Sequence, residues 1–369
     1  MVDNTAIKEN NVVGMNQHKA LEALDNKNLQ SIYKKHYARL ESLFAGQSLE
    51  TPFGLLGISV DTTNPDIDPV KWFSTALSEL AEQVPNASDE LVFRPMGICY
   101  NPRGVHFIDD LFGAEVFLHE FSEQWQAHAL GIPVGALEVP DIEKNPSWEK
   151  VQKVALLFRE YNPQNVRLIL PTLSSALNIA VNLYGEEILV AMLTDPAAAH
   201  HDLRIINDLI IKLHTWFIDN IPLDRFQPIA MTGRFQPTGH GQICGCTTQL
   251  PSNEVYNEFI ASLDAEVMSL YQHGGLIHLC GAHTQHIPTW RRMKELKSVQ
   301  MNDRATLDLP AYFDGLRDDQ ILYVDYFEDL PLEEALTITN GERTVLIGRF
   351  EDSDRETLRR WQATGATKH

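Results

Sequence analysis

The stretch Gly241-Gln-Ile-Cys-Gly-Cys-Thr-Thr-Gln-Leu-Pro-Ser252, together with the later run Gly275-Leu-Ile-His-Leu-Cys-Gly281, decides the fold. Ile243–Thr247 and Leu276–Cys280 are short runs bounded by glycine, which is typical of buried parallel strands. From Asn253 to Gln272 the apolar residues recur at three- and four-residue steps, the period of a helix with one buried face. The stretch therefore predicts a strand, a helix and a second strand.

Residues two apart on a strand project to the same side. His278 and Cys280 therefore face one way, and so do Cys244 and Cys246. Thiolate and neutral imidazole are usual ligands of zinc, and a catalytic zinc takes three protein ligands and keeps an open position. We expect His278, Cys280 and Cys246 to be these ligands. The alternative is that Cys244 and Cys246 are core residues, since free cysteine is among the most buried residue types.

The segment from Cys246 to Phe259 and the strand His278-Leu-Cys-Gly281 resemble the uroporphyrinogen decarboxylase superfamily, in which a Ser-Pro-like helix start precedes a His-x-Cys-Gly strand. The resemblance implies a (β/α)8 barrel. It also implies one of two activities, decarboxylation in the haem pathway or zinc-dependent methyl transfer between corrinoid proteins and thiols. Further matches follow in the expected order: Leu111-Phe-Gly-Ala-Glu115, Leu183-Tyr-Gly-Glu-Glu187, Thr194-Asp-Pro196 and Leu296-Lys-Ser-Val-Gln300.

Composition limits the classes of protein and partner. The chain has 369 residues, 44% of them hydrophobic, which is typical of a globular protein. Its 30 basic and 50 acidic residues give a formal net charge of −20, which argues against nucleic acid and anionic membranes as partners. Four cysteines are too few for a disulfide framework, and the polar N-terminus is no signal peptide. The expected location is the cytoplasm.

We predict an α/β protein, a (β/α)8 TIM barrel with an N-terminal helical extension. Residues 1–88 form the helical lead-in that packs on the barrel, and residues 89–369 form the barrel. An open doubly wound sheet is the alternative, but no GxGxxG or GxxxxGK[ST] motif follows a predicted strand. The predicted strands are Leu91–Ile98, Ile132–Val139, Val166–Leu170, Pro228–Met231, Ile243–Thr247, Leu276–Cys280, Lys297–Met301, Ile321–Asp325 and Thr344–Ile347.

Reactive groups in such a barrel lie at the carboxyl ends of the strands. This rule selects Tyr100, Arg103 and Glu138 as candidate substrate-binding residues. Arg103 could bind a substrate carboxylate bidentately, or pair with Asp109 or Asp110 instead.

Two histidines and two aspartates complete the predicted site. His240 lies in a Gly/Pro-rich segment that suits a binding loop or a plain surface. His283 follows the strand of Cys280 and is a candidate metal ligand, base or solvated loop residue. Asp303 and Asp325 are candidate catalytic groups because a carboxylate commonly orients a metal-bound histidine such as His278, although both could be loop acids.

The resemblance implies two candidate functions, and a third lies outside it. The first is zinc-assisted methyl transfer from a methylated corrinoid, or a similar donor, to a thiol. The family's third zinc ligand is a late cysteine, but no cysteine follows Cys280, so Cys246 or Asp303 must replace it. The second is a decarboxylase-like lyase acting on another carboxylated substrate, since residues 1–90 hold only Arg39 where the decarboxylase has an arginine cluster. The third is a non-catalytic barrel that binds a small molecule or a corrinoid protein.

Overall fold

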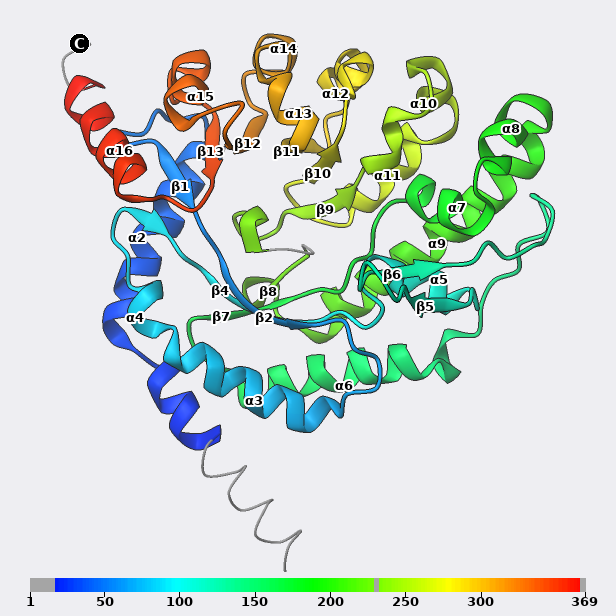
Figure 1. Ribbon diagram of the computed structural model, residues 1–369, viewed down its shortest axis with the longest axis horizontal. Coiled ribbons are helices and arrows are strands. Elements are labelled where there is room, and N and C mark those ends of the chain that lie inside the picture. The colour runs from blue at the N-terminus through cyan, green and yellow to red at the C-terminus, as the bar shows by residue number, and fades with distance from the viewer. Residues whose placement is uncertain (1–16, 229–231, 366–369) are drawn as a thin grey trace, which may run out of the picture.

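The computed structural model describes residues 17–228 and 232–365 and shows an α/β protein built on parallel strands. Its larger sheet has seven parallel strands in the order β3-β1-β13-β12-β11-β10-β9, with helices outside it (Figure 1). These strands are β1 (Phe53–Leu55), β3 (Val92–Phe93), β9 (Gly241–Cys244), β10 (Gly275–Cys280), β11 (Leu296–Asn302), β12 (Ile321–Asp325) and β13 (Thr344–Ile347).

A second sheet of four parallel strands continues the first. Its strand order is β2-β4-β7-β8. β1 pairs with β3 in the first sheet, and a few residues further along the same two segments β2 pairs with β4 in the second. The chain thus passes directly from one sheet into the other along two neighbouring strands. The strands of this sheet are β2 (Ile58–Thr62), β4 (Met96–Tyr100), β7 (Val166–Ile169) and β8 (Phe226–Gln227).

The two sheets are bridged by side chains at the remaining seam, between β8 and β9. The Nε2 of Gln227 donates to the backbone O of Gln236 over 2.9 Å, and the Nε2 of Gln236 donates to the backbone O of Gly241 over 2.9 Å. No ladder joins β8 to β9 within the described residues. The parallel sheets are therefore shown, and closure into a (β/α)8 barrel stays a prediction.

Three of the longer helices begin with the same signal, a side-chain cap followed by proline. Asp68, Asn145 and Asp195 accept backbone hydrogen bonds at the starts of α3, α6 and α9, and a proline stands next in each. The helices are α2 (Lys27–Phe44), α3 (Pro69–Glu82), α4 (Val84–Ala87), α5 (Phe107–Leu111), α6 (Pro146–Tyr161), α7 (Ala176–Tyr184), α8 (Glu187–Thr194), α9 (Pro196–Asn220), α10 (Asn253–Phe259), α11 (Ala261–Ser269), α12 (Ile287–Arg292), α13 (Asp303–Leu307), α14 (Leu309–Gly315), α15 (Leu332–Thr339) and α16 (Asp352–Gly365).

One predicted strand, Ile132–Val139, is wrong. This segment is irregular, and Gly131 and Gly135 take positive φ values of 68° and 95°. The backbone N–H groups of Gly135 and Leu137 donate to the buried carboxylate of Asp202 over 2.7 Å and 3.3 Å. The segment's hydrogen bonds therefore go to a side chain of α9 rather than to a neighbouring strand.

The structure bears on two further predictions, the helical lead-in and the strand before β9. β1 and β2 lie inside the predicted lead-in of residues 1–88. Because β1 pairs with β13 and β2 pairs with β4, this part of the lead-in belongs to the sheets. The predicted strand Pro228–Met231 falls mostly on residues 229–231, which lie outside the described residues. The short β8 ends just before it.

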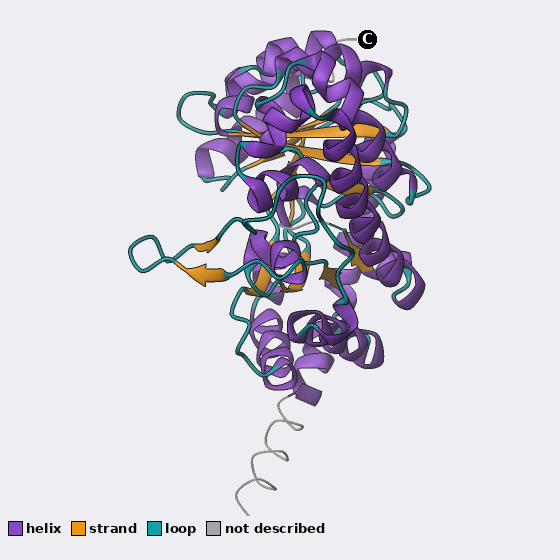
Figure 2. Ribbon diagram, turned by 90° about the vertical axis from the view of Figure 1, so that its right-hand side faces the viewer, coloured by secondary structure: helices purple, strands orange, loops and turns teal. Residues whose placement is uncertain are grey.

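An antiparallel hairpin projects from the body of the molecule (Figure 2). It consists of β5 (Val116–Leu118) and β6 (Trp125–Ala127), and Phe121 at its tip is 91% exposed. In the described part of the chain, no single helix is long and apolar enough to cross a membrane. Among the described helices, the pair α7 and α8 meets that standard when taken together, but the two are bent by 108°.

Candidate functional site

Three neighbouring strands place polar residues in one row inside the sheet. His278 in β10 lies opposite Cys244 in β9 and opposite Gln300 in β11. Partners in a parallel ladder point to the same face, and the strands are about 4.8 Å apart. The register therefore brings a thiol, an imidazole and a carboxamide together at one level of the sheet.

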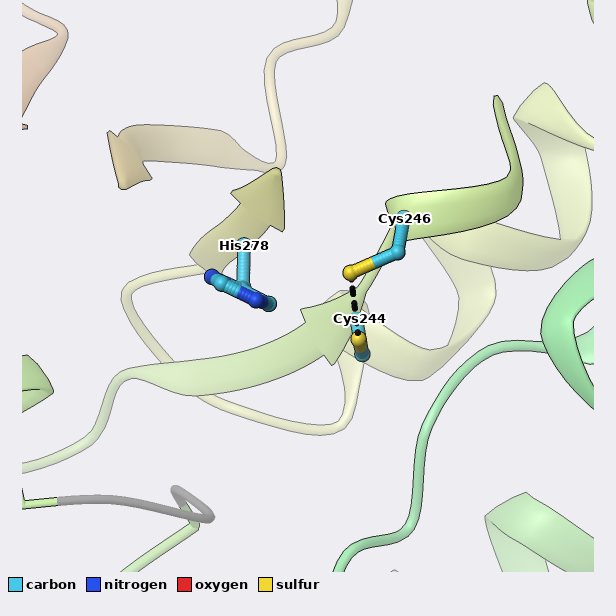
Figure 3. Close-up of side chains that lie close together, drawn as sticks. All are labelled: Cys244, Cys246 and His278. Atoms are coloured by element: carbon cyan, nitrogen blue, oxygen red, sulfur yellow. Dashed lines mark hydrogen bonds between the residues drawn. The ribbon is translucent and has the colours of Figure 1, made fainter. Parts of the chain in front are cut away.

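Cys246 reaches the same place from a turn. β9 ends at Cys244, and Cys246 begins the short 3-10 helix η5 (Cys246–Gln249). Its Sγ lies 3.4 Å from the Sγ of Cys244, and Figure 3 shows it beside Cys244 with His278 on the neighbouring strand. The ligand atoms of Cys244, Cys246 and His278 all lie within 4.8 Å of one another, so these three residues could hold a metal ion.

Cys280 adds a third thiol to this group. It ends β10, two residues after His278, and its Sγ is 3.2 Å from the Nε2 of His278. The prediction that His278 and Cys280 face the same way is confirmed by this contact. The structure thus gathers three cysteines and one histidine where the sequence predicted two cysteines and one histidine.

The ring of His278 is oriented by Gln300. The Oε1 of Gln300 contacts the Nδ1 of His278, and a carboxamide oxygen can only accept, so Nδ1 carries the hydrogen. The Nε2 lone pair is then directed at the thiols. It also accepts from the Nη2 of Arg234 over 3.1 Å. Gln300 therefore takes the orienting role that the sequence assigned to Asp303 and Asp325.

The charge of the thiols is set by their mutual contacts. The hydrogen bond with Cys246 lowers the pKa of Cys244 against the effect of burial, and the nearby guanidinium of Arg234 lowers it further. Contact with Cys246 lowers the pKa of Cys280 in the same way. The same contacts raise the pKa of Cys246. Without a metal, Cys246 thus keeps its proton, while the neighbouring thiols of Cys244 and Cys280 ionise readily. A bound cation would take the place of that proton.

Asn178 supports Cys244 and the turn that carries Cys246. Its Nδ2 donates to the Sγ of Cys244 over 3.4 Å, and its Oδ1 accepts from the backbone N of Thr247 over 3.1 Å. Asn178 stands in the first turn of α7, whose cap is Ser175. One side chain therefore fixes both the last residue of β9 and the start of η5.

The sulfurs face a cavity of about 430 Å³. Cys244, Cys246, His278 and Cys280 all line it. The rest of its wall is largely apolar or uncharged, and consists of Thr63, Asn101, Gly104, Val105, Leu170, Pro171, Thr172, Leu173, Ser174, His214, Pro228, Arg234, Gln242, Ile243 and Asn302. A small molecule in this cavity would meet the thiols directly.

The predicted substrate-binding residues lie elsewhere. The hydroxyl of Tyr100 donates to the backbone O of Ile67, and it is the next residue, Asn101, that lines the cavity. Arg103 lies 3.6 Å from Asp110, so the structure shows the ion pair that the sequence offered as an alternative. The guanidinium of Arg103 also lies 4.9 Å from the ring centre of Trp125 in the hairpin.

The remaining polar candidates are also outside the cavity. Glu138 is exposed in the irregular segment that was predicted to be a strand. His240 precedes β9, at the opposite end from Cys244, and lines a separate cavity of about 800 Å³. Asp303 is exposed, and Asp325 lies in the wall of a third cavity. Burial and the nearby Asp303 raise the pKa of Asp325 to about 6, while Arg234 opposes this.

His283 is a buried support beneath the site. It is fully buried, its Nε2 lies 2.6 Å from the backbone O of Cys280, and its Nδ1 lies 2.9 Å from the Oγ1 of Thr248. Burial lowers the pKa of His283 to about 4, so the ring is neutral. It does not line the cavity of the thiols.

Sequence reasoning missed Arg234, Gln300, Asn178 and Gln242. Gln242 and Gln300 carried a usable signal, since each stands beside apolar residues in or next to a predicted strand and must find a polar partner when buried. Arg234 ends the short 3-10 helix η4 (Thr232–Arg234) between β8 and β9, which is too short for a periodic pattern to indicate its direction.

The fold is similar to that of a known structure. A methyltransferase from Methanosarcina mazei superposes with a TM-score of 0.60 at 11% sequence identity, covering 90% of this chain and 99% of that chain. This likeness shows a shared fold. No family model matches the sequence, and no curated protein matches it.

Proposed function

We propose that this protein is a zinc-dependent methyltransferase that passes a methyl group from a methylated corrinoid, or a similar donor, to a thiol. The observation that carries the proposal is the convergence of Cys244, Cys246 and His278 within 4.8 Å. The shared fold with a methyltransferase and the resemblance of the His278-Leu-Cys-Gly281 strand to the uroporphyrinogen decarboxylase superfamily support it.

The donor set fits zinc in chemistry and in spacing. Zinc–sulfur bonds of about 2.3 Å and zinc–nitrogen bonds of about 2.0 Å place tetrahedral ligand atoms roughly 3.5 to 3.8 Å apart. The two sulfurs of Cys244 and Cys246 are 3.4 Å apart, and the Sγ of Cys280 is 3.2 Å from the Nε2 of His278. These two pairs would need small outward shifts, and no pair of ligand atoms among Cys244, Cys246 and His278 is more than 4.8 Å apart. Cys246, on η5, would replace the family's late cysteine.

The chain's own residues would prepare and orient the reactants. Gln300 holds the Nδ1 hydrogen of His278 and leaves the Nε2 lone pair for a metal. Asn178 donates to the Sγ of Cys244 and would spread part of its negative charge. Bound zinc would lower the pKa of a thiol substrate so that it reacts as thiolate. The sulfur of the thiol substrate would take the methyl group from the methylated corrinoid, and the electron pair of the cleaved cobalt–carbon bond would stay on cobalt.

A transfer assay tests this proposal directly. The full-length protein is mixed with methylcobalamin and a range of small thiols, while the absorbance of the corrinoid is followed and methyl thioether is identified by mass spectrometry. We expect His278→Ala and Cys280→Ser to lower the rate by about a hundredfold or more.

Cys99→Ser is the matched control, because Cys99 is 3% exposed and lies outside the cavity of the thiols. Its rate should stay within about twofold of the wild type. Absence of methyl thioether with every thiol would contradict the proposal. Methylcobalamin binding without any turnover would favour the non-catalytic binding barrel.

A decarboxylase-like lyase is the second candidate, and Arg234 is the observation that favours it. Arg234 is 5% exposed, lines the cavity and donates to the Nε2 of His278. A substrate carboxylate entering the cavity would be drawn to such a guanidinium.

Arg234→Met separates the two candidates. If the site holds zinc, this variant removes a donor that competes for the Nε2 lone pair, and zinc affinity should rise several-fold in a chelator competition. If the site is a lyase, the variant should lose binding of carboxylate ligands and leave metal content at background. Carbon dioxide release from carboxylated substrates that depends on Arg234 would establish the lyase instead.

A further inference from the structure

The sulfurs of Cys244 and Cys246 lie close enough to react with each other. They are 3.4 Å apart, and a disulfide bond is about 2.0 Å long, so the two atoms need to approach by about 1.4 Å. Rotation of the two side chains can supply an approach of this size. Figure 3 shows the two sulfurs directed toward each other. The pair is therefore a candidate for covalent modification as well as for metal binding.

A bend in the chain brings these two sulfurs together. Two residues of a regular strand lie about 6.6 Å apart, near the upper limit of the Cα separation that a disulfide bond spans. Cys244 and Cys246 do not share one strand, because β9 ends at Cys244 and η5 begins at Cys246. Gly245 between them has a φ of −106° and a ψ of 24°, which is outside the extended region. The two cysteines are thus closer than alternation along a strand would place them.

The bend is fixed by contacts that involve no thiol. The backbone N of Gly245 donates to the backbone O of His278 over 2.7 Å. The backbone O of Gly245 accepts from the backbone N and the Oγ1 of Thr248 over 3.0 Å and 2.8 Å. A Cβ atom at position 245 would lie 2.7 Å from the Cδ1 of Ile277, so the close packing here requires glycine. These contacts hold the two cysteines together whether or not a cation is bound.

A small oxidant can reach this pair. Cys244 and Cys246 are half-buried and line the cavity of about 430 Å³. Cys99 is buried outside this cavity, and its Sγ donates to the backbone O of Leu170 over 3.6 Å. Cys280 is the rival partner for Cys246, but its Sγ is engaged by the Nε2 of His278 over 3.2 Å. The geometry therefore favours a bond between Cys244 and Cys246.

We propose that a peroxide converts Cys244 and Cys246 into a disulfide, and that this bond switches the metal site off. Hydrogen peroxide first oxidises one thiol to a sulfenic acid: an S–O bond forms, the O–O bond breaks and water leaves. The other thiol then attacks that sulfur: the S–S bond forms, the S–O bond breaks and a second water leaves. The thiols together lose two electrons and two protons, and the peroxide becomes two waters.

The disulfide would withdraw two of the three donors in the candidate metal site. Cys244, Cys246 and His278 are the group whose ligand atoms lie within 4.8 Å of one another, and the thiolate is the form of cysteine that binds metal. Reduction by a dithiol would restore both donors. The effect of the switch on methyl transfer rests on the proposed function. The disulfide itself does not, because it requires only the two sulfurs and access to them.

Peptide mapping of the metal-stripped, full-length protein after treatment with hydrogen peroxide tests the bond. Glu254 lies between Cys246 and Cys280 in the chain, so cleavage after glutamate separates the pair from the third thiol. We expect the peptide with Cys244 and Cys246 to become about 2 Da lighter, to stay unlinked to the Cys280 peptide, and to regain its mass with dithiothreitol. The zinc affinity of the oxidised protein should fall by about a hundredfold or more and return on reduction.

Cys244→Ser and Cys246→Ser should each abolish the mass loss in this peptide, and the matched control Cys99→Ser should keep it. A bond that joins the peptides of Cys246 and Cys280, or thiols oxidised only to sulfinic acid, would overturn the inference. Both outcomes are read from the wild type, so no variant needs to fold. Unchanged zinc affinity after oxidation would overturn the switch. A reversible disulfide in a protein without methyl transfer would support the inference while removing the proposed function.

Discussion

The Oγ1 of Thr248 lies 2.9 Å from the Nδ1 of His283, and this contact joins the turn that carries Cys246 to the strand that carries Cys280. The other ring nitrogen of His283 lies 2.6 Å from the backbone O of Cys280. Because His283 touches both segments, it sets the separation of the two thiols without facing the cavity. We predict that His283→Ala weakens metal binding by about ten- to a hundredfold, as measured by competition with a chromophoric chelator.

His36→Ala is the control for losing a buried histidine. His36 is 2% exposed and its Nε2 lies 2.8 Å from the backbone O of Asp89, far from the thiols in the chain. This variant should lower the free energy of unfolding without changing metal affinity. If His283→Ala and His36→Ala changed metal affinity equally, the positioning role of His283 would be refuted.

Gln300 offers a test in both directions. Gln300→Leu removes the acceptor for the Nδ1 hydrogen of His278, so metal affinity should fall by about ten- to a hundredfold. Gln300→Glu places a carboxylate there, which makes the imidazole a stronger base and should restore or raise the affinity. Gln320→Leu, at a buried glutamine bonded to Trp290 and Leu296, should affect stability alone. Unchanged affinity in Gln300→Leu would show that the contact does not orient His278.

The titration of the buried carboxyl group of Asp264 should cause part of the pH dependence of the protein's stability. Asp264 is 1% exposed and accepts from the hydroxyl of Tyr256 over 2.7 Å. Burial raises the pKa of Asp264 from 3.8 to about 7, although the Tyr256 hydrogen bond opposes this. Between these values the folded state binds the proton more tightly than the unfolded state, so stability falls as pH rises from about 4 to about 7.

Asp264→Asn should remove this part of the slope and raise the free energy of unfolding at pH 8 by up to about 4 kcal/mol. Urea unfolding across pH 4 to 8 would measure it, with the exposed Asp224→Asn as a control. A variant whose pH slope equals that of the wild type would show that Asp264 does not titrate in this window.

Much of the fold could be predicted from short-range patterns. The apolar run at Leu276–Cys280 is β10, and the periodic segment from Asn253 to Gln272 is helical, with a break at Ile260 between α10 and α11. The irregular segment 132–139 could not be foreseen, because its backbone is held by Asp202, more than sixty positions later. A carboxylate so distant in the chain leaves no local signal.

The arrangement of the site could be predicted only for residues that lie on the same strand. Alternation alone gives His278 and Cys280 on one face. The approach of Cys244 and Gln300 to His278 depends on the register of three strands, which no sequence pattern fixes. Cys246 was expected on the strand with Cys244 but lies on η5, whose turn brings the two sulfurs closer than alternation along a strand would.

The zinc content of the purified full-length protein tests the central claim most directly. After dialysis against a weak chelator, elemental analysis should find about one zinc per chain. The variants His278→Ala and Cys246→Ser should retain less than about a tenth of that, and Cys99→Ser should retain all of it. A folded wild-type protein without stoichiometric zinc, or a His278→Ala variant that keeps its zinc, would contradict the account.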